Sequence, residues 1–124
     1  MKTLALVLLL LSHLGRPRTL ERAVELANVA TLIAVTDADE DEARALATIA
    51  IHESRASLRA VGDGGSAHGP WQVRGPDASA DRALYLVRWS VAACGDLSLY
   101  AGCGGCGRCP EIVASLLDPT LPRR

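Results

Sequence analysis

A histidine, a glutamate, a serine and an arginine stand in a row at residues 52–55, directly after an apolar run. Leu46, Ile49, Ala50 and Glu53 follow the spacing i, i+3, i+4 and i+7, so they share one face of a helix. A carboxyl at the end of an apolar face has a raised pKa, because burial disfavours its charged form. Such a carboxyl can act as a general acid near neutral pH. The alternative is that Glu53 is an ordinary charge at a helix end.

A glycine-rich stretch, "GDGGSAHGPWQV", follows this helix, and residues 60–75 contain five glycines between Gly62 and Gly75. Glycine clusters of this kind predict an irregular loop or a short hairpin, and such loops often carry functional residues. Asp63 precedes a glycine there, and Asp-Gly is itself a turn signal. Asp63 is therefore either a turn residue or a second carboxylate for a site. We expect His52 and His68 to be structural or exposed.

Helices are the elements that must position these residues. The chain is 49% hydrophobic but only 3% aromatic, so its core must consist mainly of Ala, Val, Leu and Ile, which favours closely packed helices. The acidic run at residues 37–42 is interpreted as a helix cap and first turn, where the helix dipole favours acids. In chain order, helices are predicted over residues 19–36, about 39–55, 77–94, 96–101 and 111–118, the fourth of them short and the last followed by Pro119 and Pro122.

The first fifteen residues, "MKTLALVLLLLSHLG", have the basic start and aliphatic run of a secretory signal peptide. The run is too short to span a bilayer as a simple helix. A buried first helix or an uncleaved anchor is the alternative. Residues 15–18, "GRPR", form the boundary in either case, because Pro17 disfavours helix before it. We therefore divide the chain into an N-terminal apolar segment, 1–18, and one domain, 19–124.

Length and charge limit the function classes. A chain of 124 residues suffices for one small domain with a single core. The formal net charge of −1 provides no field strong enough to hold nucleic acid or an anionic membrane surface. We expect no nucleic-acid partner, no cofactor and no stable membrane span, and we expect a monomer.

Three blocks of this sequence resemble the lysozyme-like superfamily that cuts peptidoglycan, in particular the soluble lytic transglycosylases and goose-type lysozymes. The block "ALATIAIHESR" ends in Glu-Ser, where the family has its catalytic glutamate. The block "GDGGSAHGPWQV" contains the family's Gly-x-x-Gln pattern at residues 69–72. The block "LSLYAG" is similar to the family's later Tyr-containing helix, although Ala101 stands where the family often has Asn. The blocks occur in the family's order over roughly residues 39–107.

The resemblance implies a mainly α, small lysozyme-like helical domain with a glycine-rich loop or minimal hairpin. It implies a secreted or periplasmic enzyme, or a phage-associated one, that cuts the β-1,4 bond between MurNAc and GlcNAc in peptidoglycan glycan strands. Glu53 would be the catalytic acid/base. The resemblance also implies residues that bind and orient the substrate, namely Ser54, Asp63, Gln72 and Tyr100.

The reaction type depends on the number of carboxylates. Glycosidases usually need two, whereas the lytic transglycosylases that this chain resembles use one and leave a 1,6-anhydro end. We expect transglycosylase chemistry, because the sequence places only Glu53 on an apolar face. A goose-type muramidase that uses Asp63 is the alternative. A catalytically idle lysozyme-like module, which binds cell wall or plugs a secretion or phage assembly, is the alternative from another class.

Four cysteines lie within residues 94–109, namely Cys94, Cys103, Cys106 and Cys109. An oxidising compartment and an even count favour disulfides. Four cysteines could instead hold zinc or an iron–sulfur cluster, but they do not form a paired C-x2-C ribbon, and we expect no metal. We expect the bond Cys94–Cys106, with Cys103 and Cys109 left to pair, because the helix end and the loop must meet for Tyr100 to reach the site that the resemblance implies.

Overall fold

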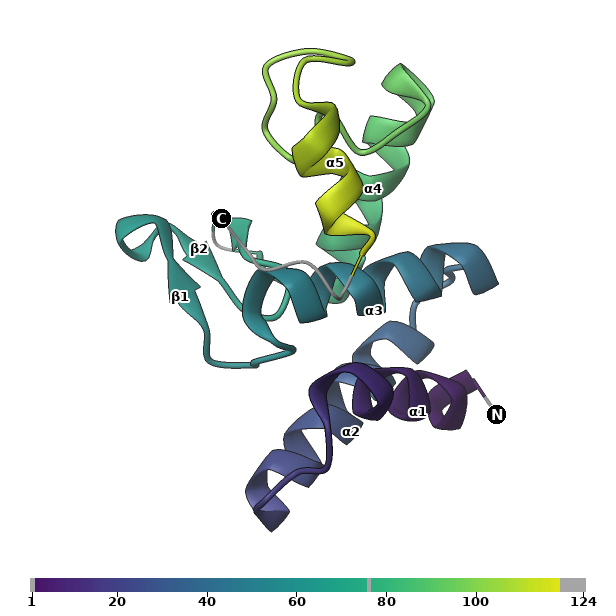
Figure 1. Cartoon of the computed structure of the whole chain (residues 1–124), viewed down its shortest axis with the longest axis vertical. Helices are drawn as coiled ribbons and strands as arrows, with labels where there is room; N and C mark the ends of the chain where they lie inside the picture. The colour runs from purple at the N-terminus through teal and green to yellow at the C-terminus, as the bar shows by residue number, and fades with distance from the viewer. Residues whose placement is uncertain (1, 76, 119–124) are drawn as a thin grey trace.

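Five helices pack together beside a small three-stranded sheet in the computed structural model (Figure 1). The structure describes residues 2–75 and 77–118. The predicted mainly α class of this small domain is thereby confirmed. The helices are α1 (Lys2–Leu14), α2 (Leu20–Ala34), α3 (Glu40–Ser54), α4 (Ala80–Cys94) and α5 (Pro110–Leu116). The strands are β1 (Val61–Gly62), β2 (Ala67–His68) and β3 (Val73–Arg74).

Helix α3 is the central element. It packs against each of the other four helices, and Figure 1 shows α1 and α2 on one side of it and α4 and α5 on the other. Its start is a capping box, in which Asp39 accepts from the backbone amide of Glu42 and Glu42 accepts from that of Asp39. Its end is Arg55, which has left-handed backbone angles. The predicted cap and end of this helix are confirmed.

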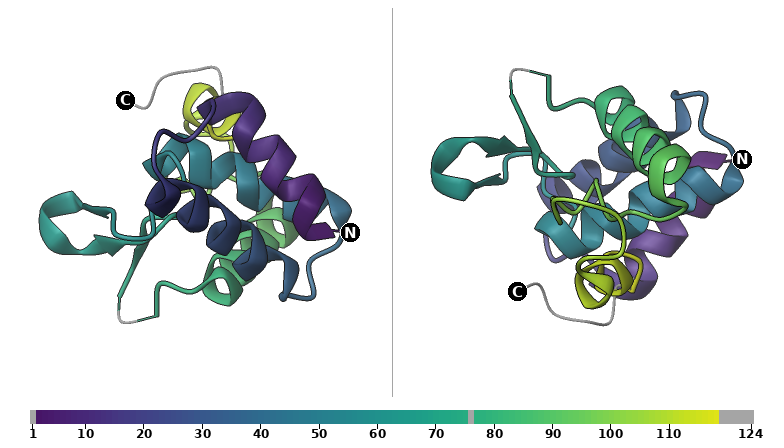
Figure 2. Two further views of the ribbon diagram at one scale, coloured as in Figure 1. Left: turned by 90° about the horizontal axis from the view of Figure 1, so that it is seen from below. Right: turned by 90° about the horizontal axis from the view of Figure 1, so that it is seen from above.

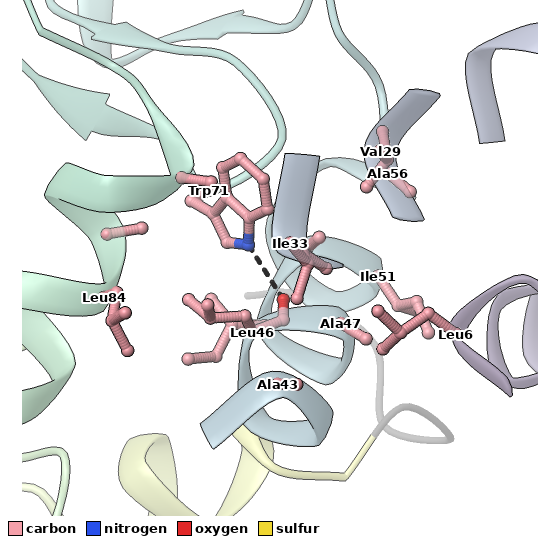
Figure 3. Packing of buried hydrophobic residues seen from close by; sticks show 14 of the residues in the cluster. Leu6, Val29, Ile33, Ala43, Leu46, Ala47, Ile51, Ala56, Trp71 and Leu84 are labelled. Carbon is pink, nitrogen blue, oxygen red and sulfur yellow. Dashed lines mark hydrogen bonds between the residues drawn. The ribbon is translucent and has the colours of Figure 1, made fainter. Parts of the chain in front are cut away.

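The face of α3 that the sequence pattern predicted to be apolar is indeed buried. Leu46, Ile49 and Ala50 have no exposed surface. Trp71 inserts against this face, and its indole Nε1 donates to the carbonyl of Leu46 at 2.8 Å, as Figure 3 shows. The glycine-rich stretch is therefore attached to the middle of α3 by the largest side chain of the core.

Helix α1 packs against both α2 and α3. Its Leu6 and Leu10 are buried, and the Lys2 ammonium donates to the carbonyl of Ala38 at 2.7 Å. Residues 15–18 form the predicted break before α2, which begins after its N-cap Thr19. Cleavage of the N-terminal segment as a signal peptide stays a prediction. Within residues 2–75 and 77–118, no helix has the length and apolar character needed to cross a membrane.

The predicted minimal hairpin is a three-stranded antiparallel sheet in the order β1-β2-β3. Val61 pairs with His68, and Ala67 pairs with Arg74. A 3-10 turn at Asp63–Gly65 joins β1 to β2, and Asp63 itself has a positive φ of 51°. Figure 2 shows that the sheet extends from one side of the helical part.

Helix α4 begins after the N-cap Ser79 and ends at Gly95, whose φ of 74° suits glycine. The short helix predicted over residues 96–101 is wrong, because these residues form turns. The hydroxyl of Ser90, on the preceding helix α4, accepts from the amides of Leu99 and Tyr100, and the Asp96 carboxylate accepts from the Ser98 amide. A helix over these residues would have paired the Tyr100 amide with the Asp96 carbonyl, and the Ser90 hydroxyl bonds to both groups instead.

The four cysteines form the two predicted disulfides, Cys94–Cys106 and Cys103–Cys109. The first joins Cys94, the last residue of α4, to a second glycine-rich segment at residues 102–107. The second closes the loop directly before α5. Helix α5 runs from Pro110 to Leu116, so it starts one residue before the predicted helix and ends two residues before it. Pro119 and Pro122, which were predicted to follow it, lie outside the described residues.

Candidate active site

A cleft of about 620 Å³ opens between α3, the sheet, α4 and the segment that leads to α5. Four of the five predicted site residues line it, namely Glu53, Asp63, Gln72 and Tyr100. They come from three separate parts of the chain: the last turn of α3, the glycine-rich stretch, and the turn after α4. Ser54, the fifth, lies beside this cleft without lining it.

Glu53 stands in the last turn of α3, partly buried at the wall of the cleft. The chain turns sharply just after it, because Arg55 and Ala56 both have positive φ. The guanidinium of Arg22, on α2, donates to the carbonyl oxygens of both residues. Helix α2 thereby satisfies carbonyls at the end of α3, which holds the turn that carries Glu53.

Ser54 joins the end of α3 to the glycine-rich stretch. Its hydroxyl lies 2.8 Å from the carbonyl oxygen of Pro70, to which it donates, and it accepts from the amide of Ser57 at 3.0 Å. Together with the bond from Trp71 to Leu46, this contact fixes the stretch at two points on α3. Ser54 therefore holds Pro70, and with it the glycine-rich stretch, against the end of α3 that carries Glu53.

Gln72 lines the cleft and lies in a strained backbone conformation, with φ of 50°. Its side-chain amide donates to the carbonyl of Gly69 at 2.9 Å and to that of Ala60 at 3.2 Å. A Cβ on Gly62 would lie too close to the Gln72 Oε1 atom, so a larger residue there would displace the end of this side chain. The side-chain amide of Gln72 thus holds the two arms of the glycine-rich stretch together.

Asp63 lines the cleft and pairs with Arg74 of β3. The carboxylate and guanidinium are 3.0 Å apart, and their side chains are 46% and 73% exposed. The Asp63 carbonyl accepts from the amide and hydroxyl of Ser66, as in a turn. Asp63 therefore combines the features of a turn residue with a carboxylate that faces the cleft.

Tyr100 lines the cleft from the turn after α4. Its hydroxyl donates to the carbonyl of Trp71 at 3.3 Å. Burial raises the pKa of the Tyr100 phenol, and the nearby negative charge of Glu53 raises it further. The phenol consequently stays protonated at neutral pH and remains a donor beside Glu53.

Several lining residues were not predicted from the sequence. His52 was expected to be structural or exposed, and it borders the cleft next to Glu53. Arg82 and Leu86 of α4 also line it, as do Ile112 and Ser115 of α5. Arg82 and Leu86 are four residues apart, on a helix face beside the one that buries Ala83, Leu84 and Val87. This spacing is the signal that could have indicated a second wall.

The cleft gathers several ionisable side chains. The cleft carries two carboxylates, two arginines and a histidine, so its charges are balanced. Among the described residues no group of three His, Cys, Asp or Glu side chains could hold a metal ion, and the four cysteines are paired with one another. Glu53 is the partly buried carboxyl among the lining residues, and the Tyr100 phenol lies beside it.

Searches of protein-family models, curated proteins and solved structures found no match to this chain.

Proposed function

We propose that this protein cleaves the β-1,4 bond between MurNAc and GlcNAc in peptidoglycan glycan strands, with Glu53 as the catalytic acid and base. The observation that carries this proposal is the convergence of Glu53, Gln72 and Tyr100 on one cleft. These residues come from the three sequence blocks that resemble the lytic transglycosylases, and they lie far apart along the chain.

The proposed reaction needs one carboxyl. Glu53 gives its proton to the glycosidic oxygen as the bond from MurNAc C1 to that oxygen breaks, and the substrate's acetamido oxygen stabilises C1. The resulting Glu53 carboxylate then takes the proton of the MurNAc 6-hydroxyl as O6 bonds to C1. The products are a GlcNAc end with a free 4-hydroxyl and a 1,6-anhydro-MurNAc end, and no water is consumed. The Tyr100 phenol, whose pKa is raised, stays protonated beside Glu53 throughout.

The two disulfides are compatible with an extracellular or periplasmic location, where the proposed substrate occurs. The residues that line the cleft come from the sheet on one side and from α4 on another, and the sheet extends from the helical part (Figure 2). We propose that the glycan strand lies between these two elements. These features support a polymer as the substrate of the proposed enzyme.

The decisive experiment is the substitution Glu53→Gln, assayed by the release of soluble muropeptides from purified cell wall. Gln is almost the same size but cannot deliver a proton, and general acid–base catalysis contributes about 10²–10⁴-fold. We expect cleavage to fall by at least that factor while the thermal unfolding midpoint stays close to that of the wild type.

Glu40→Gln is the matched control, because Glu40 lies on the same helix and its side chain is 88% exposed. We expect this variant to cleave cell wall like the wild type. If Glu53→Gln retains activity within a few-fold of the wild type, Glu53 is not the catalytic acid and base. A wild-type protein that binds cell wall without releasing muropeptides would instead support the idle binding module.

A further inference from the structure

Two of the four aromatic residues in this chain stand on the outer face of α4. Tyr85 is 57% exposed and Trp89 is 46% exposed, whereas Trp71 is buried and Tyr100 lines the cleft. Large exposed aromatic rings at neighbouring helix positions indicate a binding surface more often than a folding requirement.

These two rings continue the wall of the cleft. Arg82, Tyr85, Leu86 and Trp89 follow the spacing i, i+3, i+4 and i+7, so they form one stripe along α4, here called the α4 strip. Arg82 and Leu86 line the cleft, and the Arg82 guanidinium carbon lies 4.9 Å from the centre of the Tyr85 ring. The strip therefore begins inside the cleft and runs out of it towards the end of α4.

We propose that the α4 strip is an additional carbohydrate subsite, which holds the glycan strand where it leaves the cleft. This inference rests on the proposed function and specifies its substrate as a chain longer than the cleft itself. Seven residues of helix separate Arg82 from Trp89, which is about 10 Å. That length is comparable to one disaccharide repeat of an extended β-1,4-linked glycan.

The chemistry of the strip fits a sugar chain. A pyranose ring presents a face of C–H groups, which pack on the electron-rich face of an aromatic ring. The Arg82 guanidinium, held over Tyr85, can bind the lactyl or peptide carboxylates that MurNAc carries. Continuity with the cleft through Arg82 and Leu86 favours the glycan over a separate protein partner.

The test measures the affinity of soluble glycan oligomers by calorimetry, using full-length protein that carries Glu53→Gln so that the ligand is not consumed. Trp89→Ala and Tyr85→Ala are compared with Val91→Ala, since Val91 lies on the same helix and is 47% exposed. We expect each aromatic variant to bind a decasaccharide about threefold to tenfold more weakly and a tetrasaccharide with unchanged affinity. Val91→Ala should change neither affinity, and Trp89→Phe should recover most of the loss.

Equal losses for the short and the long oligomer would overturn the inference, because the strip would then act on the cleft itself. Unchanged affinity for both oligomers would also overturn it, and a protein partner would then be the alternative occupant of the α4 strip. The two proposals fail separately. Cleavage assays on the wild-type protein test Glu53, whereas length-dependent binding in the Glu53→Gln background tests the strip.

Discussion

Glu53 and Asp63 both face the cleft, but they differ in how firmly they are held. Glu53 is partly buried in the last turn of the central helix. Asp63 lies in a 3-10 turn of a protruding sheet, 46% exposed, and is paired with an arginine that is 73% exposed. Catalytic groups need tight placement. An exposed turn is a poor support for the second carboxylate that an inverting hydrolase must hold about 6.5–9.5 Å from the first.

We therefore predict that Asp63→Asn retains activity within about tenfold of the wild type, whereas Glu53→Gln loses about 10²-fold or more. The products of the wild-type enzyme should carry 1,6-anhydro ends, which mass spectrometry of the muropeptides detects directly. If reducing MurNAc ends dominate and Asp63→Asn is as inactive as Glu53→Gln, the goose-type muramidase is the correct alternative.

At the level of elements, an ion-pair cluster joins α4 to the start of α3. Arg88 donates to both carboxylate oxygens of Glu42, at 2.7 and 2.9 Å, and to the Asp37 carboxylate at 2.9 Å. The bond from Arg88, followed by the one from the Asp39 amide, lowers the pKa of Glu42 from 4.5 to about 2. The pKa of Arg88 is raised for the same reason, chiefly by Glu42.

This cluster predicts a specific pH dependence of stability. Because the folded pKa of Glu42 is lower than its unfolded value, its contribution is fully present above pH 4.5 and is lost as the pH falls towards about 2. The free energy of unfolding, measured with urea, should therefore fall more steeply over this pH window for the wild type than for Glu42→Gln. Glu40→Gln, which changes an exposed acid of the same helical turn, should follow the wild type. Parallel curves for Glu42→Gln and wild type would contradict the prediction.

The two disulfides have different relations to the cleft. The segment between Cys94 and Cys106 contains Tyr100, Ala101 and Gly102, all of which line the cleft, whereas the segment from Cys103 to Cys109 contributes none of the lining residues. The first bond spans 12 residues and the second spans 6. The longer bond therefore constrains both a larger loop and the residue that lines the cleft beside Glu53.

Removing each disulfide by a pair of Cys→Ser substitutions should separate these effects. Either loss is expected to cost about 2–5 kcal/mol of unfolding free energy. Loss of Cys94–Cys106 should cost about 0.6 kcal/mol more, because its loop is twice as long. It should also reduce cell-wall cleavage more strongly than loss of Cys103–Cys109, since Tyr100 is released. Equal activities of the two variants, or four free thiols in a non-reducing peptide map of the wild type, would contradict this.

At the level of the whole molecule, α1 completes the core on the side away from the cleft. Its Leu10 is fully buried and its Leu6 is 5% exposed, while Leu8 on the opposite face of the same helix is 58% exposed. The aliphatic segment that was predicted to be a secretory signal thus forms α1, and one face of this helix is buried in the core. Its leucines contribute to stability only in a chain that retains this segment.

We predict that Leu10→Ala lowers the unfolding free energy by about 2–5 kcal/mol, because it leaves a cavity in the core. Leu8→Ala, the matched exposed change, should alter it by less than about 0.5 kcal/mol. Both are measured by urea unfolding of protein whose mass shows that residues 1–18 are present. Equal, negligible effects would show that α1 is not part of the folded core.

Local patterns in the sequence were sufficient for most of the helical framework. Apolar residues at helical spacing predicted α2, α3 and α4, and the acidic run at residues 37–42 predicted the cap of α3, because caps and amphipathic faces depend on neighbouring residues alone. Local pattern did not predict the turns at residues 96–101. There the amides bond to Ser90, a residue on the preceding helix.

The cleft itself depended on contacts between distant segments. The order of the sequence blocks identified Glu53, Gln72 and Tyr100 as candidates, but their convergence requires Trp71 to dock on α3 and a disulfide to hold the turn after α4. The second wall, formed by Arg82 and Leu86, follows from the way α4 packs across α3. Helix ends are specified by residues a few positions apart, whereas a cleft forms only when packing of the whole core brings separate elements together.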